Sequence, residues 1–315
     1  MELNGNTSPA ARAQDGAAAR RKTGRQQRYE RRMAYLFVSP QILGLLVFFL
    51  FPAAMSVYLC FVNWDMVGIP TFVGMDNFKE VFADAQLTQS LTNTGIFVFG
   101  IVPLTTLIAL GLALATNRPI RGLGFYKAAF YLPQATASVA IVLVWYWLLA
   151  PDIGLFNYFL SLFGIQGPGW LIDTFWAKLA IMLMTAWQGM GYYFLILLAG
   201  LKGISADYYE AADIDGANKR QKFFRITLPM LSTALFFVLI TMTIGVFNLF
   251  QEPMILTEGG PAFSTYTITM YIYDLAFKYF RMGEAAVASL VLLVVVIFVT
   301  ILQFRMSKRW VYYND

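Results

Sequence analysis

Six stretches of apolar residues follow one another along the chain, and each is long enough to cross a bilayer as a helix. They cover about residues 33–60, 93–115, 126–149, 177–201, 226–250 and 284–304. A membrane-spanning helix needs about 20 mainly apolar residues. The first stretch is longer than this minimum, so we expect it to tilt or to extend past the membrane. The pattern predicts an all-α membrane protein with six transmembrane helices.

The basic residues between these stretches predict how the helices are oriented. Lys and Arg number eight in residues 1–32, three in 116–127, five in 202–225 and three in 305–315. These segments lie on one side if the helices alternate in direction, and they hold 19 of the 23 basic residues. Basic loops favour the cytoplasm, so we expect both termini there. No base-reading motif accompanies this charge, so we expect contact with anionic lipid and not with nucleic acid.

The same pattern divides the chain into three parts. Residues 1–32 form a basic cytoplasmic tail that is expected to be disordered over 1–28, where large apolar side chains are almost absent. Residues 33–305 form one transmembrane domain, and residues 306–315 form a cytoplasmic C-terminal tail. Within the domain, residues 266–280 are apolar and aromatic but shorter than a span, which is typical of a helix at the membrane interface.

Composition argues against an enzyme. Charged residues make up 13% of the chain, against about 25% in soluble domains, and 58% of residues are hydrophobic. The chain has no His, and its one Cys, Cys60, excludes an internal disulfide. It contains no GxxxxGK[ST] phosphate-binding loop. Asp207, Glu210, Asp213 and Asp215 cluster in sequence but do not share a helix face, so we predict no metal, no cofactor and no catalytic site in this chain.

The polar segment between the fourth and fifth stretches differs from a simple turn. Glu210, Ala211 and Ala212 favour a helix, Gly216 favours its end, and Pro229 is suited to the start of the next helix. Two small alanines beside a carboxylate would let another protein approach closely. We therefore predict a docking segment within the loop 202–225.

This segment resembles the signature of permease subunits of binding-protein-dependent ABC importers. The matching residues are Glu210-Ala-Ala212, Asp215-Gly-Ala217, Phe224 and Ile226-x-Leu-Pro229. Further stretches are similar to the carbohydrate branch, which includes the maltose and glycerol-phosphate permeases. They are Gly124–Pro133, Trp145 with Pro151–Asn157, Thr257–Pro261 and Gly74–Phe78. The resemblance covers about residues 33–305.

The resemblance implies a type I ABC importer permease that forms half of a pathway for a sugar or oligosaccharide. It implies a second permease, expected to be a different chain, and an external solute-binding protein that delivers the cargo. Two cytoplasmic ATP-binding subunits would bind ATP and Mg and carry out hydrolysis. The location implied is the cytoplasmic (inner) membrane of a bacterium or archaeon. The coupling helix would then contain Glu210, Ala211, Ala212, Asp215 and Gly216.

Polar groups within the spans point to a place for the cargo. Polar side chains are costly in lipid and usually face a cavity or another helix. Gln188 and Tyr192 share a face of the fourth span, and a stripe in the fifth comprises Thr241, Gly245, Asn248 and Glu252. Amides can bond sugar hydroxyls, and aromatic rings can stack on sugar rings. With the positions implied by the resemblance, the predicted pathway residues are Gln188, Gly189, Tyr192, Met242, Val246, Asn248, Leu249 and Gln251.

Other readings stay open at this point. The polar groups in the spans could bond only to neighbouring helices. An ion-gradient-driven secondary transporter would favour charged residues in mid-membrane, which the six stretches lack. For a membrane scaffold protein, the segment around Glu210 would serve only as a docking site.

Overall fold

The computed structural model describes residues 24–312, with side chains from residue 28 onward, and the chain forms two compact units, 1–58 and 59–315. The first unit contains α2 (Gly24–Leu45), the π-helical turn η1 (Leu46–Leu50) and most of α3 (Phe51–Leu59). Together they give a continuous helical span. The helix begins at Gly24, within the range expected to be disordered. The rest of the predicted N-terminal tail and residues 313–315 lie outside the described part.

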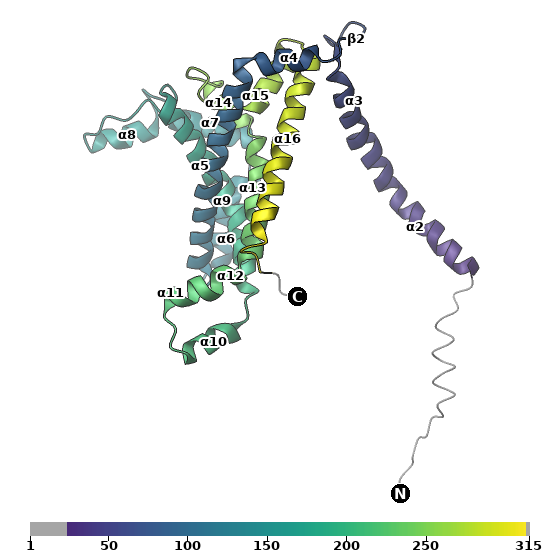
Figure 1. Ribbon diagram of the computed structural model, residues 1–315. Coiled ribbons are helices and arrows are strands. Elements are labelled where there is room, and N and C mark those ends of the chain that lie inside the picture. Colours follow the sequence, from purple (N-terminus) through teal and green to yellow (C-terminus); the bar gives the residue numbers. More distant parts are fainter. Residues whose placement is uncertain (1–23, 313–315) are drawn as a thin grey trace. The chain divides into compact units, whose positions relative to one another are not determined.

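The second unit, which we call the helical body, is a bundle of long helices (Figure 1). Its straight spans are α5 (Ala85–Thr116), α9 (Thr174–Lys202) and α16 (Met282–Ser307). Two further spans are bent. One joins α6 (Leu123–Ala135) to α7 (Ser138–Leu148). The other joins α11 (Lys219–Lys222), η2 (Phe223–Thr227) and α12 (Leu228–Met230) to α13 (Ser232–Phe247).

Within residues 24–312, four helices are long and apolar enough to cross a membrane, and six spans result if each bent pair is counted as one. Each of the six predicted apolar stretches therefore corresponds to a helix or a bent helix pair. The protein is a mainly helical membrane protein, as the pattern predicted.

Short elements lie at the two ends of the body (Figure 1). One end, which we call the α4 end, carries α4 (Asp76–Ala83), α8 (Leu155–Leu162), α14 (Gln251–Thr257), α15 (Ile268–Tyr273) and η3 (Asp274–Lys278). It also carries an antiparallel pair, β1 (Val62–Asn63) and β2 (Thr71–Phe72), with Val62 opposite Phe72. The other end carries α10 (Ala206–Ile214) beside α11.

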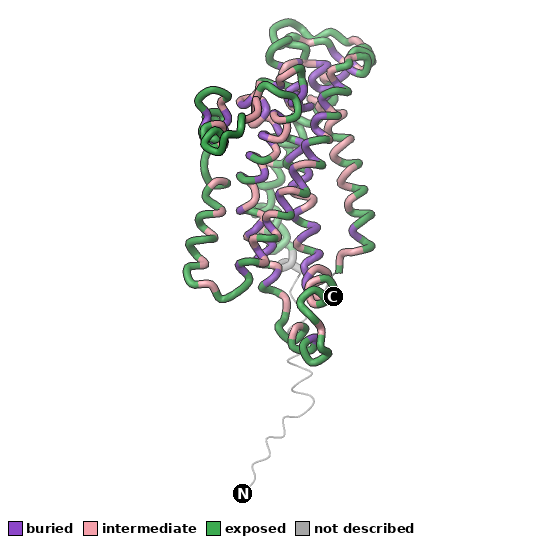
Figure 2. Tube along the Cα trace, turned by 90° about the vertical axis from the view of Figure 1, so that its left-hand side faces the viewer, coloured by how far each residue is buried: buried purple, intermediate pink, exposed green. Residues whose placement is uncertain are grey.

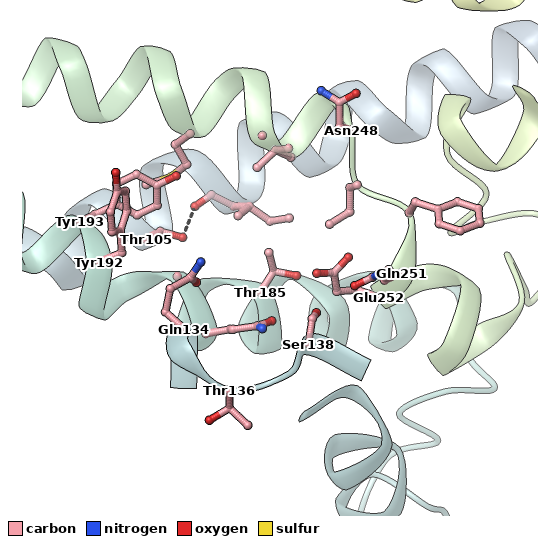
Figure 3. A pocket seen from close by; sticks show the side chains of 18 of the residues that line it. Thr105, Gln134, Thr136, Ser138, Thr185, Tyr192, Tyr193, Asn248, Gln251 and Glu252 are labelled. Carbon is pink, nitrogen blue, oxygen red and sulfur yellow. Dashed lines mark hydrogen bonds between the residues drawn. The ribbon is translucent and has the colours of Figure 1, made fainter. Parts of the chain in front are cut away.

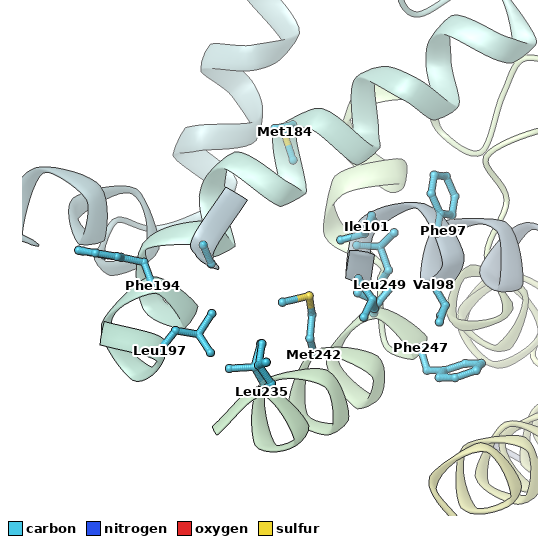
Figure 4. Close-up of a cluster of buried hydrophobic side chains, with 14 of the residues drawn as sticks. Phe97, Val98, Ile101, Met184, Phe194, Leu197, Leu235, Met242, Phe247 and Leu249 are labelled. Atoms are coloured by element: carbon cyan, nitrogen blue, oxygen red, sulfur yellow. The ribbon is translucent and has the colours of Figure 1, made fainter. Parts of the chain in front are cut away.

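The main core runs along the inner faces of α5, α9 and α13. Figure 4 shows Phe97, Met184, Leu197 and Met242 among its buried side chains. The outer faces of the body are exposed and apolar, as lipid-facing surfaces should be: Figure 2 shows burial concentrated on the inner helices, and Phe99 is 83% exposed.

A second core occupies the α4 end and includes the segment predicted to be an interfacial helix. One face of this segment packs on the protein, because Tyr266, Ile268 and Tyr271 are buried against neighbouring elements, and the contact of its other face with the membrane interface stays a prediction. The buried amide of Asn93 donates to the carbonyl oxygens of Phe263 at 2.7 Å and Tyr266 at 3.0 Å. Such bonds satisfy backbone groups that water would otherwise bind, so the segment packs on the protein.

Candidate functional site

A cavity of about 700 Å³ lies between α5, the α6–α7 pair, α9 and the end of α13 that points to the α4 end (Figure 3). All eight predicted pathway residues line this cavity: Gln188, Gly189, Tyr192, Met242, Val246, Asn248, Leu249 and Gln251. The structure therefore gathers the predicted set in one place. Their part in transport stays a prediction.

One wall of the cavity is a break that the sequence pattern did not reveal. We expected one continuous span over residues 126–149, but α6 and α7 meet at an angle of 93°. Pro133 lies in the last turn of α6, and the backbone at Thr136 is extended. Non-helical backbone at membrane depth is tolerated where it lines a cavity. Gln134, Thr136 and Ser138 line the cavity at this break. The sequence signal that could have predicted this break is Pro133 followed by small and polar residues.

The polar stripe in the fifth span is also interrupted. α13 ends at Phe247, and the Asn248 side-chain amide donates to the carbonyl of Ile244 at 2.8 Å. The prediction that Thr241, Gly245, Asn248 and Glu252 lie along one face of a continuous helix is therefore wrong. The Thr241 hydroxyl bonds the carbonyl of Phe237 within its own helix, and Thr241 is absent from the cavity lining. Gly245, Asn248 and Glu252 do line it.

The cavity offers polar groups that are free to bond a guest. Among the described residues, the side chains of Gln188, Tyr192 and Gln251 have no hydrogen-bond partner, so they do not serve to join neighbouring helices. The buried hydroxyl of Thr185 also lacks a partner. Figure 3 shows Thr185 and Glu252 directed into the same space. The side chains of Gln188, Tyr192 and Gln251 can bond hydroxyls of a guest, whereas the Thr185 oxygen is fully buried.

One carboxyl group and several apolar side chains complete the lining. Glu252 is the single charged residue among the described residues that line the cavity, and burial raises its pKa. Met242, Val246 and Leu249 add apolar surface beside the polar groups. This mixture suits a guest with hydroxyls and apolar faces. No cluster of three or more His, Cys, Asp or Glu side chains that could hold a metal occurs in the described part of the chain.

The opposite end of the body carries the predicted docking segment as α10. The Ser205 hydroxyl caps its start by accepting from the Asp207 amide. Gly216 follows its end with φ +75°, a conformation that glycine adopts without strain. The Ala217 amide donates to the Ala212 carbonyl at 2.9 Å and the Gly216 amide to that of Asp213 at 3.1 Å, a Schellman motif. The helix and its stop at Gly216 are confirmed.

The exposed face of α10 differs in part from the predicted one. Glu210 and Ala211 are exposed, whereas Ala212 is buried against the protein. Ile214, which was not predicted, is 87% exposed and lies on the same helix face as Glu210. Asp215 and Gly216 are exposed at the helix end. The sequence contained a signal for this exposed face, because an apolar residue four positions after Glu210 lies on the same side of a helix.

The charges on α10 are not all balanced locally. Asp213 forms an ion pair with Lys222, whereas Glu210 has no ion pair or hydrogen bond from its carboxylate to any described residue. Its charge is free to meet a partner from outside.

Two contacts join α10 to the bent span beside it. The Tyr209 hydroxyl bonds the Thr227 hydroxyl at 3.0 Å, and the Lys222 ammonium pairs with Asp213. Thr227 lies in η2, and the chain then bends by 61° at Leu231 into α13. Residues at the far end of α13 line the cavity. One bent element therefore links α10 to the cavity.

Comparison with known proteins identifies the class of this architecture. Residues 107–312 match the family model described as "Binding-protein-dependent transport system inner membrane component". The chain is 39% identical to the probable ABC transporter permease protein YesP of Bacillus subtilis (96% of this chain, 98% of the relative). It is 35% identical to the sn-glycerol-3-phosphate transport system permease protein UgpA of Agrobacterium fabrum (90% and 97%) and 36% identical to the lactose transport system permease protein LacF of Rhizobium radiobacter (90% and 96%).

A solved structure has a similar fold. It is the crystal structure of a bacterial alginate ABC transporter in complex with an alginate pentasaccharide-bound periplasmic protein, with a TM-score of 0.76, 23% identity, and coverage of 90% of this chain and 96% of that one. The predicted resemblance to importer permeases is thus confirmed, as is the prediction of a transport subunit instead of an enzyme. The chain belongs to the family of inner membrane components of binding-protein-dependent transport systems.

Proposed function

We propose that this chain forms half of the pathway through which an ATP-driven ABC importer carries a sugar or a related polyol. The observation that carries this proposal is the bent element α11–α13. It touches α10 through Thr227 and Lys222 at one end and lines the cavity through Met242 and Val246 at the other. A movement imposed on α10 would therefore reach the cavity directly.

The cargo class is supported by the cavity and by the relatives together. Unpartnered amides and hydroxyls suit a guest rich in hydroxyl groups, and apolar side chains beside them suit the carbon faces of a sugar ring. LacF is named for lactose transport and UgpA for sn-glycerol-3-phosphate transport. Both named cargoes carry hydroxyl groups. An external solute-binding protein would deliver the cargo to the α4 end.

The energy would come from two ATP-binding subunits that hold ATP and Mg, with no cofactor in this chain. They would receive the exposed face of α10, where the free Glu210 carboxylate can meet a basic group. A hydrogen bond to a charged group contributes about 1.5–3 kcal/mol. ATP would close the subunit pair, shift α10 and tilt α13. ATP can drive this change only because it binds the two states with different affinity.

The remaining partners and the location follow from the same assembly. A second permease, expected to be a different chain, would complete the pathway. The assembly would lie in the cytoplasmic (inner) membrane of a bacterium or archaeon, with α10 and both termini in the cytoplasm. The basic residues gathered in the segments at the α10 end support this orientation.

Purification of the tagged chain from its native membrane in mild detergent tests the proposal. We expect ATP-binding subunits and a second permease to co-purify, and we expect the solute-binding protein with its cargo to stimulate ATP hydrolysis. Transport by the chain alone under an ion gradient would instead indicate a secondary transporter. A complex that lacks nucleotide-binding subunits would indicate a scaffold.

A further inference from the structure

The segment between α7 and α9 has an unusual composition for a connection outside the spans. Residues 153–172 contain no Asp, Glu, Lys or Arg, although Asp152 and Asp173 flank them. A soluble segment of this length would carry about five charges. The segment includes α8. Neither the cavity nor the docking segment α10 explains why these residues carry no charge.

Hydrogen bonds fix one face of α8 against its own loop. The Asn157 amide donates to the carbonyls of Pro151 at 3.0 Å and Pro168 at 3.4 Å. The indole N–H of Trp170 donates to the Asn157 side-chain oxygen at 2.8 Å. A Cβ on Gly167 would lie 2.0 Å from that oxygen, so this closure requires glycine. The polar side of α8 is therefore satisfied internally.

The opposite face of α8 is apolar and uncovered. Leu155, Tyr158, Phe159 and Leu162 follow the i, i+3, i+4, i+7 spacing of one helix face. Their exposed fractions are 37%, 59%, 52% and 62%. Phe163, which follows the helix, is 79% exposed. Rigid attachment by Asn157 means that the segment cannot turn this face inward without breaking its hydrogen bonds.

The position of α8 indicates what covers this face. Figure 1 shows α8 projecting sideways from the helical body near the ends of α7 and α9 that it connects, at a level below α4. The space between α8 and the body is an apolar cavity of about 290 Å³, lined in part by Trp145, Phe156, Trp170 and Trp187. Aromatic residues are enriched at the level of lipid headgroups. The apolar surface thus continues from the lipid-facing spans onto α8.

We propose that α8 lies in the interface of the bilayer at the α4 end, with Leu155, Tyr158, Phe159 and Leu162 inserted at the boundary of headgroups and acyl chains. This insertion would hold the adjoining ends of α7 and α9 at a fixed depth. A protein partner is a poorer occupant, because the rim of a protein interface is polar and this segment carries no charge. The proposal does not depend on the transported cargo or on ATP.

Collision measurements on nitroxide labels test this placement. The full chain with its co-purified subunits is reconstituted into liposomes of phosphatidylethanolamine and phosphatidylglycerol, in a Cys60→Ala background. Labels are placed at Phe159→Cys, at Lys79→Cys on α4 as the water-exposed reference, and at Leu107→Cys on α5 as the lipid-facing reference. The accessibility to oxygen is compared with the accessibility to a water-soluble nickel chelate.

We expect the oxygen-to-nickel ratio at position 159 to exceed that at position 79 several-fold and to approach that at position 107. Leu162 belongs to the apolar face of α8, and Ser161 lies beside that face. A label at Ser161→Cys should therefore give a lower oxygen-to-nickel ratio than a label at Leu162→Cys. A ratio at 159 equal to that at 79 would place α8 in water and overturn the proposal. A label shielded from both reagents would show a protein cover and would equally overturn it. Retention of the co-purified subunits by each labelled variant establishes that it is folded.

Discussion

The four acidic residues of α10 show how the meaning of a side chain depends on its surroundings. Asp207 lies at the capped start of the helix, Asp213 is paired with Lys222, and Asp215 lies at the helix end. The carboxylates of Glu210 and Asp215 have no ion pair or hydrogen bond to any described residue, and of these two only Glu210 lies within the helix. A carboxylate without an internal partner is suited to an external one. The docking role therefore belongs to Glu210 more than to its acidic neighbours.

Glu210→Ala should weaken the binding of the ATP-binding subunits about tenfold or more, because a charged hydrogen bond of about 1.5–3 kcal/mol would be lost. Co-purification and the ratio of transport to ATP hydrolysis measure the effect. Glu258→Ala is a matched control, since Glu258 is an exposed carboxylate at the opposite end of the body. Transport by Glu210→Ala at the wild-type rate would count against the docking role.

Single residues of the cavity lining give a second prediction. Gln188→Leu and Asn248→Leu should each slow cargo uptake about two- to tenfold, as expected for the loss of one neutral hydrogen bond of about 0.5–1.5 kcal/mol. The ATP-binding subunits should stay bound. Uptake kinetics in proteoliposomes measure this change, with Phe237→Leu as the control, since Phe237 is half-exposed in the same span and lies outside the cavity lining. Unchanged kinetics in both variants would remove these residues from the pathway.

At the scale of elements, the cavity depends on a close crossing of two helices. A Cβ added to Gly191 of α9 would lie 1.9 Å from the carbonyl oxygen of Phe130 in α6. Only glycine permits this approach, and the approach positions the broken end of α6 beside α9. The break at Thr136 then places Gln134 and Ser138 in the same cavity lining as Gln188. Local backbone chemistry in two helices thus creates the cavity wall.

Gly191→Ala should destabilise the helical body by about 1–3 kcal/mol, the usual cost of overpacking. Thermal unfolding of the purified protein in detergent should show a lower Tm. Gly189→Ala is the matched control on the same helix, because its Cβ would meet its nearest neighbour, Tyr193, at 3.6 Å, an ordinary contact. Equal Tm values for the two variants would contradict the close crossing.

The link between α10 and the bent span gives another prediction. Tyr209→Phe removes the bond to Thr227, worth about 0.5–1.5 kcal/mol. We expect less cargo transported per ATP hydrolysed, with the ATP-binding subunits still attached, because α10 would then follow η2 less closely. Tyr208→Phe is the control, since the Tyr208 hydroxyl has no partner among the described residues. A normal ratio in Tyr209→Phe would exclude this bond from the coupling path.

The sequence located every span and the short helix α10, because burial in lipid demands long apolar stretches and because Gly216 is a strong local stop. It did not reveal the breaks at Thr136 and Asn248. A broken helix keeps the apolar composition of a continuous one, so a pattern of hydrophobicity averages across it. The buried position of Ala212 was also missed, since the burial of a small residue depends on tertiary packing.

At the scale of the whole molecule, the α10 end and the α4 end have different chemistry. The α10 end presents an exposed carboxylate and an exposed Ile214, and within the helical body it carries the basic segments 116–127, 202–225 and 305–312. The α4 end holds α8 and the hydrogen bonds of the buried Asn93 amide. The candidate pathway residues were predicted as a set from two sources: the resemblance indicated most of their positions, and the polar stripe of the fifth span added Asn248. The residues Gln134, Ser138 and Thr185 were missed, since only the fold brings them together.

The central claim is that α10 lies on the cytoplasmic side and is covered there by ATP-binding subunits. Labelling of Ala211→Cys with a membrane-impermeant maleimide, in a Cys60→Ala background, tests it most directly. We predict no labelling in intact cells, strong labelling in opened membranes stripped of the ATP-binding subunits, and protection when those subunits are restored. Labelling of intact cells, or labelling that the restored subunits do not prevent, would contradict the account.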